Sequence, residues 1–161
     1  MPEKFILDAT AGYRMMWFNK HEPHTIYLDQ RPECEPDIVG DFRDLNQFPD
    51  KTFRFIIFDP PHFVKHNPAP YFKERYGCLQ PETWQNDLRQ GLAECWRVLQ
   101  DYGILLFKWN TQNKSKRQII RLLPTEPLLY QITRNSAIRP SETAQTLWFC
   151  FMKIPAKEVK P

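Results

Sequence analysis

Short runs of apolar residues, separated by polar segments that contain Pro, Gly or acidic residues, recur along the whole chain. Most of these runs are rich in β-branched and aromatic side chains, which is typical of buried β-strands. The pattern predicts strands at 5–9, 25–29, 37–41, 53–58, 104–109, 128–133 and 146–152. Strands that are buried on both faces and separated by helical segments favour an α/β fold with a mostly parallel sheet.

The segment from 81 to 99 has helical periodicity. Its large apolar residues recur at steps of four and three, so they share one face of a helix that begins at Pro81: Trp84, Leu88, Leu92, Trp96 and Leu99. We expect this face to pack on the sheet. A shorter basic helix is expected from Ser115, a favourable N-cap residue, to Leu123.

Two connecting segments lie next to predicted strands. The first strand runs into Gly12, and residues 14–18 favour a short helix whose N-terminal N–H groups would face a ligand. Residues 63–80 contain Pro68, Pro70 and Gly77 and are expected to form a long loop. A loop of this length beside a candidate site is typically a lid or a substrate-binding element.

The composition describes one globular domain. With 161 residues and 42% hydrophobic side chains, the chain is long enough for one sizeable core but too short for two. We expect a domain at 1–154, a flexible tail at 155–161, no signal peptide and no membrane-spanning segment. The four cysteines are widely spaced and the histidines lack zinc-ligand spacing, so we expect reduced thiols, no metal and a cytoplasmic location.

The net charge of +3 is unevenly distributed. Residues 1–61 carry 11 acidic and 7 basic side chains, whereas residues 62–161 carry 8 acidic and 15 basic ones. The stretch from Lys108 to Arg121 holds five bases and no acid. Most such stretches are solvated helix faces, but they are also typical of surfaces that contact phosphates. Both interpretations remain open at this point.

Acidic residues close three of the predicted strands, and the fourth strand ends in Asp59-Pro-Pro-His62. The two prolines stiffen this turn, so Asp59 and His62 are held at the carboxyl end of a strand, where open α/β sheets bind ligands. Asp29 follows the first strand by about 20 residues, the spacing at which an acid grips ribose hydroxyls in nucleotide-binding units. Asp-Pro is also common in ordinary turns, so the motif alone does not decide between a turn and an active site.

These residues together resemble class I S-adenosylmethionine-dependent methyltransferases, and within them the amino-methyltransferases marked by (D/N)PP(Y/F/W). Asp59-Pro-Pro-His62 matches that motif with His62 at the aromatic place. The segments 8–12, 40–45, 94–99 and 103–108 are similar to the family's cofactor loop, the segment before the motif, a helix and the fifth strand. The resemblance spans residues 4–153. It implies a Rossmann-like fold with a mostly parallel seven-stranded sheet, flanking helices and an antiparallel last strand.

The resemblance also implies an activity, the transfer of a methyl group from S-adenosylmethionine to an exocyclic base amine, with adenine N6 in DNA preferred. The implied catalytic residues are Asp59, Pro60, Pro61 and His62. The implied cofactor contacts are Asp8, Ala9, Thr10, Ala11, Gly12, Asp29, Asp41 and Phe42. The expected substrate contacts are Phe63, Lys65, Lys108, Trp109, Lys114, Lys116 and Arg117.

Several alternatives remain open. The acceptor can be RNA, a small-molecule amine or the side chain of glutamine instead of DNA. The chain can also be a non-catalytic methyltransferase-like subunit whose basic face binds nucleic acid for a partner. We expect nucleic acid as the binding partner, with DNA favoured over RNA, and a homodimer or a partner subunit that supplies target recognition.

Overall fold

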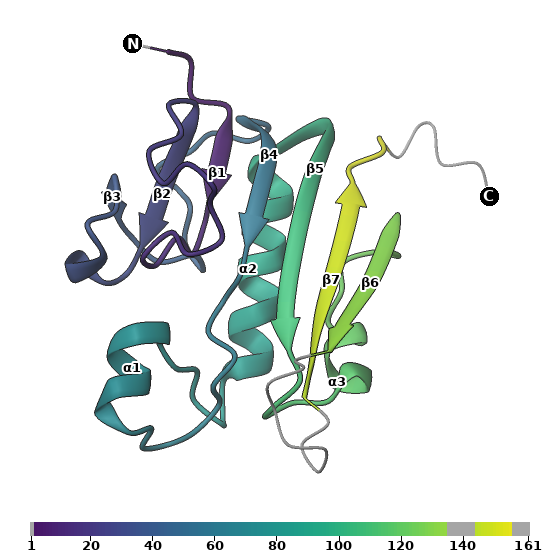
Figure 1. The fold of residues 1–161 in the computed structure, drawn as a ribbon. Coiled ribbons are helices and arrows are strands. Elements are labelled where there is room, and N and C mark those ends of the chain that lie inside the picture. The colour runs from purple at the N-terminus through teal and green to yellow at the C-terminus, as the bar shows by residue number, and fades with distance from the viewer. Residues whose placement is uncertain (1, 135–143, 156–161) are drawn as a thin grey trace.

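A computed structural model describes residues 2–134 and 144–155 of the chain. These residues form a seven-stranded sheet with the order β3-β2-β1-β4-β5-β7-β6 (Figure 1). The strands are β1 Ile6–Asp8, β2 Thr25–Asp29, β3 Ile38–Val39, β4 Phe53–Phe58, β5 Leu99–Asn110, β6 Leu129–Arg134 and β7 Gln145–Met152. Each strand overlaps one that the hydrophobic pattern predicts, but β5 begins at Leu99, five residues before the expected start at 104.

The strands from β1 to β5 pair in parallel, and β7 runs antiparallel to both β5 and β6. This topology confirms the Rossmann-like fold class, the mostly parallel sheet and the antiparallel last strand. Because the parallel strands point the same way, Asp8, Asp29 and the residue after Phe58 meet at one edge of the sheet. The edge at the carboxyl ends of the strands is therefore the place for a site.

One long helix, α2 (Trp84–Val98), packs against a single face of the sheet and lies behind β4 and β5 in Figure 1. Its buried apolar side chains join those of the strands in one core that includes Leu88, Phe58 and Phe149. The other helices are short: η1 (Pro32–Cys34), α1 (Pro70–Tyr76) and α3 (Lys116–Ile120). The capping box of Ser115 and Gln118 starts α3, so the expected N-cap is confirmed.

The opposite face of the central strands carries apolar side chains that are only partly buried. The pairing register places Phe55, Ile104 and Met152 side by side across β4, β5 and β7, with Leu106 and Cys150 in the next row. No helix of the described residues lies across this row in Figure 1. Most of the buried core therefore lies on the α2 side.

The expected helix at 14–18 is wrong. This segment forms successive turns, because Gly12 and Arg14 both have positive φ, 49° and 55°. The guanidinium of Arg14 lies 4.0 Å from the ring centroid of Tyr27 and donates to the carbonyls of Lys20 and Glu35. These contacts hold the chain in a conformation that a helix cannot adopt.

The loop expected at 63–80 contains a helix, α1, which begins at Pro70 as proline at the first helical position allows. Of the expected tail at 155–161, only Pro155 lies within the described residues. Among those residues, no helix is long and apolar enough to cross a membrane. No group of three His, Cys, Asp or Glu side chains in the described ranges could hold a metal ion.

Candidate active site

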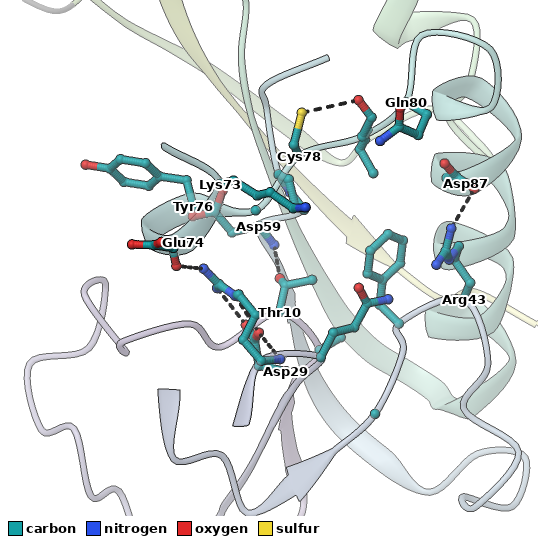
Figure 2. A pocket seen from close by; sticks show the side chains of 18 of the residues that line it. Thr10, Asp29, Arg43, Asp59, Lys73, Glu74, Tyr76, Cys78, Gln80 and Asp87 are labelled. Atoms are coloured by element: carbon teal, nitrogen blue, oxygen red, sulfur yellow. Dashed lines mark hydrogen bonds and ion pairs between the residues drawn. The ribbon is translucent and has the colours of Figure 1, made fainter. Parts of the chain in front are cut away.

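Two cavities lie side by side at the carboxyl edge of the sheet. The first, of about 560 Å³, extends over the ends of β1, β2 and β3 and is covered by α1 (Figure 2). The second, of about 380 Å³, lies between the turns after β1 and the ends of β4 and β5. Both cavities are lined by Thr10, Arg31, Asp59, Pro61 and Tyr76. A ligand in one cavity would therefore meet a ligand in the other beside Asp59.

Asp59 follows directly after β4 and is held from three sides. Its backbone N–H donates to Oγ1 of Thr10 at 2.8 Å. The ammonium of Lys108 donates to Oδ2 at 2.6 Å. Oδ1 lies 3.0 Å from Nε2 of His62, but it receives no hydrogen bond of good geometry from the described residues. Oδ2 is thus fixed by Lys108, and Oδ1 is buried beside His62.

The charge of Asp59 depends on these neighbours. Burial raises the pKa of the Asp59 carboxyl, but His62 and Lys108 lower it by a greater amount, so the pKa lies below its usual range. A carboxyl with a lowered pKa is ionised at neutral pH. Asp59 therefore presents a charged acceptor to the cavities.

His62 lies beside Asp59 with the edge of its ring against Trp109, at a centroid distance of 5.3 Å. His62 and Phe63 line the second cavity, and their expected roles, catalytic for His62 and substrate contact for Phe63, stay predictions. Trp109 does not line either cavity. It is fully buried against Trp84, with a centroid distance of 6.5 Å, so it supports His62 from behind. The sequence correctly indicated that Trp109 lies at the carboxyl edge of the sheet. It did not reveal that the side chain lies on the face of β5 that packs on α2 and not in a cavity.

Asp29, at the end of β2, anchors the first cavity. Arg31 binds both of its carboxylate oxygens, at 2.9 and 3.0 Å, and the N–H of Gly12 donates to Oδ2 at 2.7 Å. Burial raises the pKa of Asp29, but the bonds from Arg31 and Gly12 outweigh it, so the pKa is lowered. Gly12 has φ +49°, and a Cβ there would lie 3.1 Å from Nη2 of Arg31. Glycine is therefore needed at this turn.

Arg31 also connects the cavity floor to its cover. Its Nη1 donates to the carbonyl of Glu74 in α1 at 3.0 Å, as Figure 2 shows. At the end of α1, Gly77 has φ +73°, and a Cβ there would lie 2.8 Å from Cγ of Pro61. The helix α1 therefore sits directly against the Asp59–His62 turn. Sequence reasoning missed Arg31 as part of the site. It expected the segment 63–80 beside the site but missed that this segment contains the helix α1.

A sequence signal for Arg31 exists in the repeated pattern Asp-x-Arg. Arg43 binds Asp41 through paired hydrogen bonds, as Arg31 binds Asp29, and it also reaches Asp87 of α2 at 3.0 Å. Phe42 and Arg43 line the first cavity, whereas Asp41 does not. Asp41 therefore orients Arg43, and its expected contact with a cofactor stays a prediction.

The first residues of the cofactor segment are divided between the cavities. Ala9 lines the first, Ala11 and Gly12 line the second, and Thr10 lines both. Asp8 lines the second cavity and is almost fully buried. The indole Nε1 of Trp17 donates to its Oδ2 at 2.7 Å. Burial raises the pKa of Asp8 to about 7.

We predict that Asp8→Asn stabilises the fold at high pH. Because the pKa of Asp8 is raised from 3.8 to about 7, the unfolded chain releases its proton first, and stability falls as the pH rises between these values. The full effect is at most about 4 kcal/mol. Asparagine keeps the acceptor for Trp17 and removes the penalty. Thermal unfolding from pH 4 to 8 should show a gain that grows with pH. A gain that is independent of pH would contradict this origin.

The remaining basic residues expected to contact substrate lie outside both cavities. They are Lys65, Lys114, Lys116 and Arg117. The ammonium of Lys114 lies 4.9 Å from the ring centroid of Trp84, and that of Lys116 lies 4.8 Å from Tyr130. Cation–π contacts of this kind fix a positive charge on an aromatic surface. Contact of these residues with a substrate stays a prediction.

No protein-family model matches the chain, and no curated protein matches its sequence. Solved structures do match. A SAM-dependent methyltransferase from Leishmania major has a TM-score of 0.59 and 12% identity, with 92% of this chain and 65% of that chain covered. TrmN from Thermus thermophilus has a TM-score of 0.62 and 14% identity, with 95% and 45% covered.

A third match is 1,6-didemethyltoxoflavin-N1-methyltransferase from Burkholderia thailandensis, solved with 1,6-didemethyltoxoflavin and S-adenosylhomocysteine. It has a TM-score of 0.59 and 13% identity, with 95% of this chain and 72% of that chain covered. The chain spans less than two thirds of the length of the first two proteins. These likenesses show the fold: the chain has the Rossmann-like fold of class I methyltransferases.

Proposed function

We propose that this chain is an S-adenosylmethionine-dependent N-methyltransferase that acts on an exocyclic base amine, with adenine N6 in DNA as the preferred target. The observation that carries the proposal is the position of Asp59, an ionised carboxylate in the wall shared by two adjoining cavities. One cavity would hold the methyl donor, and the other would hold the acceptor amine. The Asp59-Pro-Pro-His62 motif supports an amine acceptor.

The first cavity has donors and acceptors that fit the cofactor. In the first cavity, Asp29 would accept from the ribose hydroxyls. The methionine part would extend toward the second cavity, along the backbone from Ala9 to Gly12 and beside Asp8. Phe42 supplies an apolar wall for the adenine ring. When bound, S-adenosylmethionine supplies an electrophilic methyl group on a sulfonium ion.

The chain's own residues would activate the acceptor. The lone pair of an exocyclic base amine is delocalised into the ring, so the amine is a poor nucleophile. The carboxylate of Asp59 would accept one N–H and the carbonyl of Pro60 the other, which holds the nitrogen toward sp³ geometry. Both acceptors also stabilise the positive charge that develops on nitrogen. In-line placement of nitrogen, methyl and sulfur supplies much of the remaining acceleration.

The second cavity has features that favour a planar base as the acceptor. His62 and Phe63 lie next to Asp59, and Tyr76 and Tyr13 provide further rings. A base in a duplex would have to rotate out of the stack to reach this position, and flat side chains would then hold it. The basic residues outside the cavities, Lys65, Lys114, Lys116 and Arg117, would contact the phosphate backbone.

A second candidate function is methyl transfer to a small-molecule amine. Two observations favour it. Four of the basic residues expected to contact substrate lie outside both cavities: Lys65, Lys114, Lys116 and Arg117. In addition, one structural neighbour was solved with the small molecule 1,6-didemethyltoxoflavin. RNA methylation uses the same chemistry at Asp59 and is separated from DNA methylation only by assay. A non-catalytic subunit is disfavoured by the intact Asp59-Pro-Pro turn between two open cavities.

Cofactor binding is the first test of the proposal. We predict that S-adenosylmethionine binds in calorimetric titration and that Asp29→Ala weakens binding by about 1–3 kcal/mol, because the ribose hydroxyls and Arg31 lose their acceptor. Lys51→Ala, at the opposite end of β4, is the control and should bind as the wild type does. Wild-type affinity in Asp29→Ala would remove Asp29 from the site, and no binding to the wild-type protein would contradict the proposed function.

Salt dependence separates nucleic acid from small molecules. We predict that binding to DNA weakens steeply as salt is raised, since Lys and Arg side chains release counterions from phosphates. Neutralising Lys114, Lys116 and Arg117 together should reduce the slope of log affinity against log salt concentration by roughly 2–3. Fluorescence anisotropy with a labelled duplex, a labelled RNA and free adenosine measures this. Binding that does not depend on salt would favour the small-molecule candidate.

A further inference from the structure

Lys108 lies inside the site instead of on a phosphate-contacting surface. We propose that Lys108 is a positioning residue, which binds Oδ2 of Asp59 and thereby fixes the orientation and the charge of the carboxylate that receives the acceptor amine. The inference rests on the proposed function, because it gives Lys108 a role within that reaction. In this role Lys108 binds the carboxylate of Asp59, whereas the sequence pattern predicts that it contacts the substrate.

The sheet brings Lys108 to this place. Phe58 and Phe107 are partners in the parallel pair of β4 and β5, so Asp59, the first residue after β4, lies next to Lys108 of β5. Nζ of Lys108 lies 2.6 Å from Oδ2 of Asp59, and its side chain is only 21% exposed. The ammonium also lies 5.5 Å from the ring centroid of Trp148 on β7. Lys108 is therefore held between two partners and does not extend into solvent.

The carboxylate of Asp59 is constrained at two points. Its backbone N–H is bound to Thr10, and its Oδ2 is bound to Lys108. The remaining oxygen, Oδ1, is buried and lacks a hydrogen bond of good geometry within the described chain, although His62 is 3.0 Å away. With Oδ2 fixed, the plane of the carboxylate cannot rotate freely, and Oδ1 keeps one direction. Such orientation is worth much of an enzyme's acceleration.

Lys108 also influences the charge of Asp59. The charged and titratable groups that face the carboxylate are Lys108 from β5, His62 from the same turn and Asp8 from β1. Without Lys108, a buried carboxyl would face Asp8 with only His62 to balance it. The pKa of the Asp59 carboxyl would then rise, and Asp59 would bind a proton at higher pH than in the wild type. A protonated Asp59 donates a hydrogen bond and can no longer accept two charge-assisted ones at its oxygens.

The test is the pH profile of single-turnover methyl transfer to a short adenine-containing duplex. Wild-type activity should fall on the acid side as Asp59 is protonated. In Lys108→Met this fall should occur about 1–3 pH units higher, with activity recovering toward the wild-type value at alkaline pH. Lys108→Arg, which keeps the charge, should restore the wild-type profile. Lys51→Met is the matched control, since it removes another Lys–Asp pair of 2.6 Å far from the site.

A second measurement does not depend on activity. NMR titration of ¹³C-labelled aspartate carboxyls follows Asp59 directly, with Asp59→Asn used to assign its signal. The titration of Asp59 should move to higher pH in Lys108→Met, or in Lys108→Gln if the methionine variant does not fold. An unchanged titration of Asp59 overturns the inference even if the protein is an active methyltransferase. A titration of Asp59 that moves to higher pH in Lys108→Met supports the inference about Lys108, even if the acceptor proves to be another amine.

The kinetic result can overturn the inference in a different way. If Lys108→Met raises KM for the duplex and flattens the salt dependence, with no change in the acid side of the profile, Lys108 contacts a phosphate. A protein that transfers no methyl group to any amine contradicts the proposed function instead, and the NMR titration still decides whether Lys108 controls Asp59.

Discussion

Replacing Asp59 by asparagine is expected to slow methyl transfer by about 100-fold or more while cofactor binding changes little. Asparagine keeps the volume of the side chain and the turn formed by the two prolines. It replaces a charged acceptor by an amide that both donates and accepts, and charge-assisted hydrogen bonds are roughly twice as strong as neutral ones. Lys108 also loses its anionic partner. Single-turnover rates and calorimetric titration with S-adenosylmethionine measure the two effects separately.

His62→Phe is the companion variant for this experiment. If the ring of His62 only holds the base, phenylalanine should retain much of the activity, because it is flat and packs against the same edge of Trp109. A wild-type rate in Asp59→Asn would show that the proposed mechanism is wrong. Equal loss of cofactor binding would show instead that the substitution disturbs the first cavity.

Replacing Trp109 by alanine is expected to lower the free energy of unfolding by about 3–5 kcal/mol. Trp109 is 0% exposed and packs between Trp84 of α2 and the ring of His62, so its removal leaves a large cavity beneath the site. A loss of this size is a large part of the stability of a domain. Denaturant unfolding followed by circular dichroism measures it.

Trp109→Phe should cost much less, because it keeps most of the apolar volume and removes an indole N–H that has no partner among the described residues. Phe18→Ala is the control for a lost aromatic ring. Phe18 is fully exposed, so its removal should change stability by no more than about 0.5 kcal/mol. If Trp109→Ala instead unfolds like the wild type and binds substrate weakly, Trp109 contacts the substrate as the sequence first indicated.

Much of the fold could be predicted because each strand carries its own signal. Runs such as Phe55–Phe58 are apolar over their full length and are followed by a turn, so neither their type nor their order depended on distant contacts. The acids at strand ends followed from the same reasoning, since parallel strands bring their carboxyl ends to one edge. Asp29 and Asp59 therefore met in the site as expected.

The errors arose where a distant partner decides the conformation. Residues 14–18 have the composition of a helix, but Arg14 packs on Tyr27 of β2 and takes a positive φ. The helix α1 was taken for loop because Pro68 and Pro70 resemble breakers, whereas Pro70 begins the helix. The contact of Arg14 with Tyr27 and the start of α1 at Pro70 cannot be inferred from the local sequence pattern, because contacts with distant residues decide them.

The sequence by itself determined the strands, the long helix α2, the edge at which a site would form and the presence of an acid–proline–proline turn there. These features depend on local hydrophobic pattern and on the fixed φ of proline. Only the tertiary structure decided that Lys108 binds Asp59, that Arg31 binds Asp29 and that Trp109 faces the core. Pairing register and the choice of sheet face set these contacts, and both depend on how strands far apart in the sequence align.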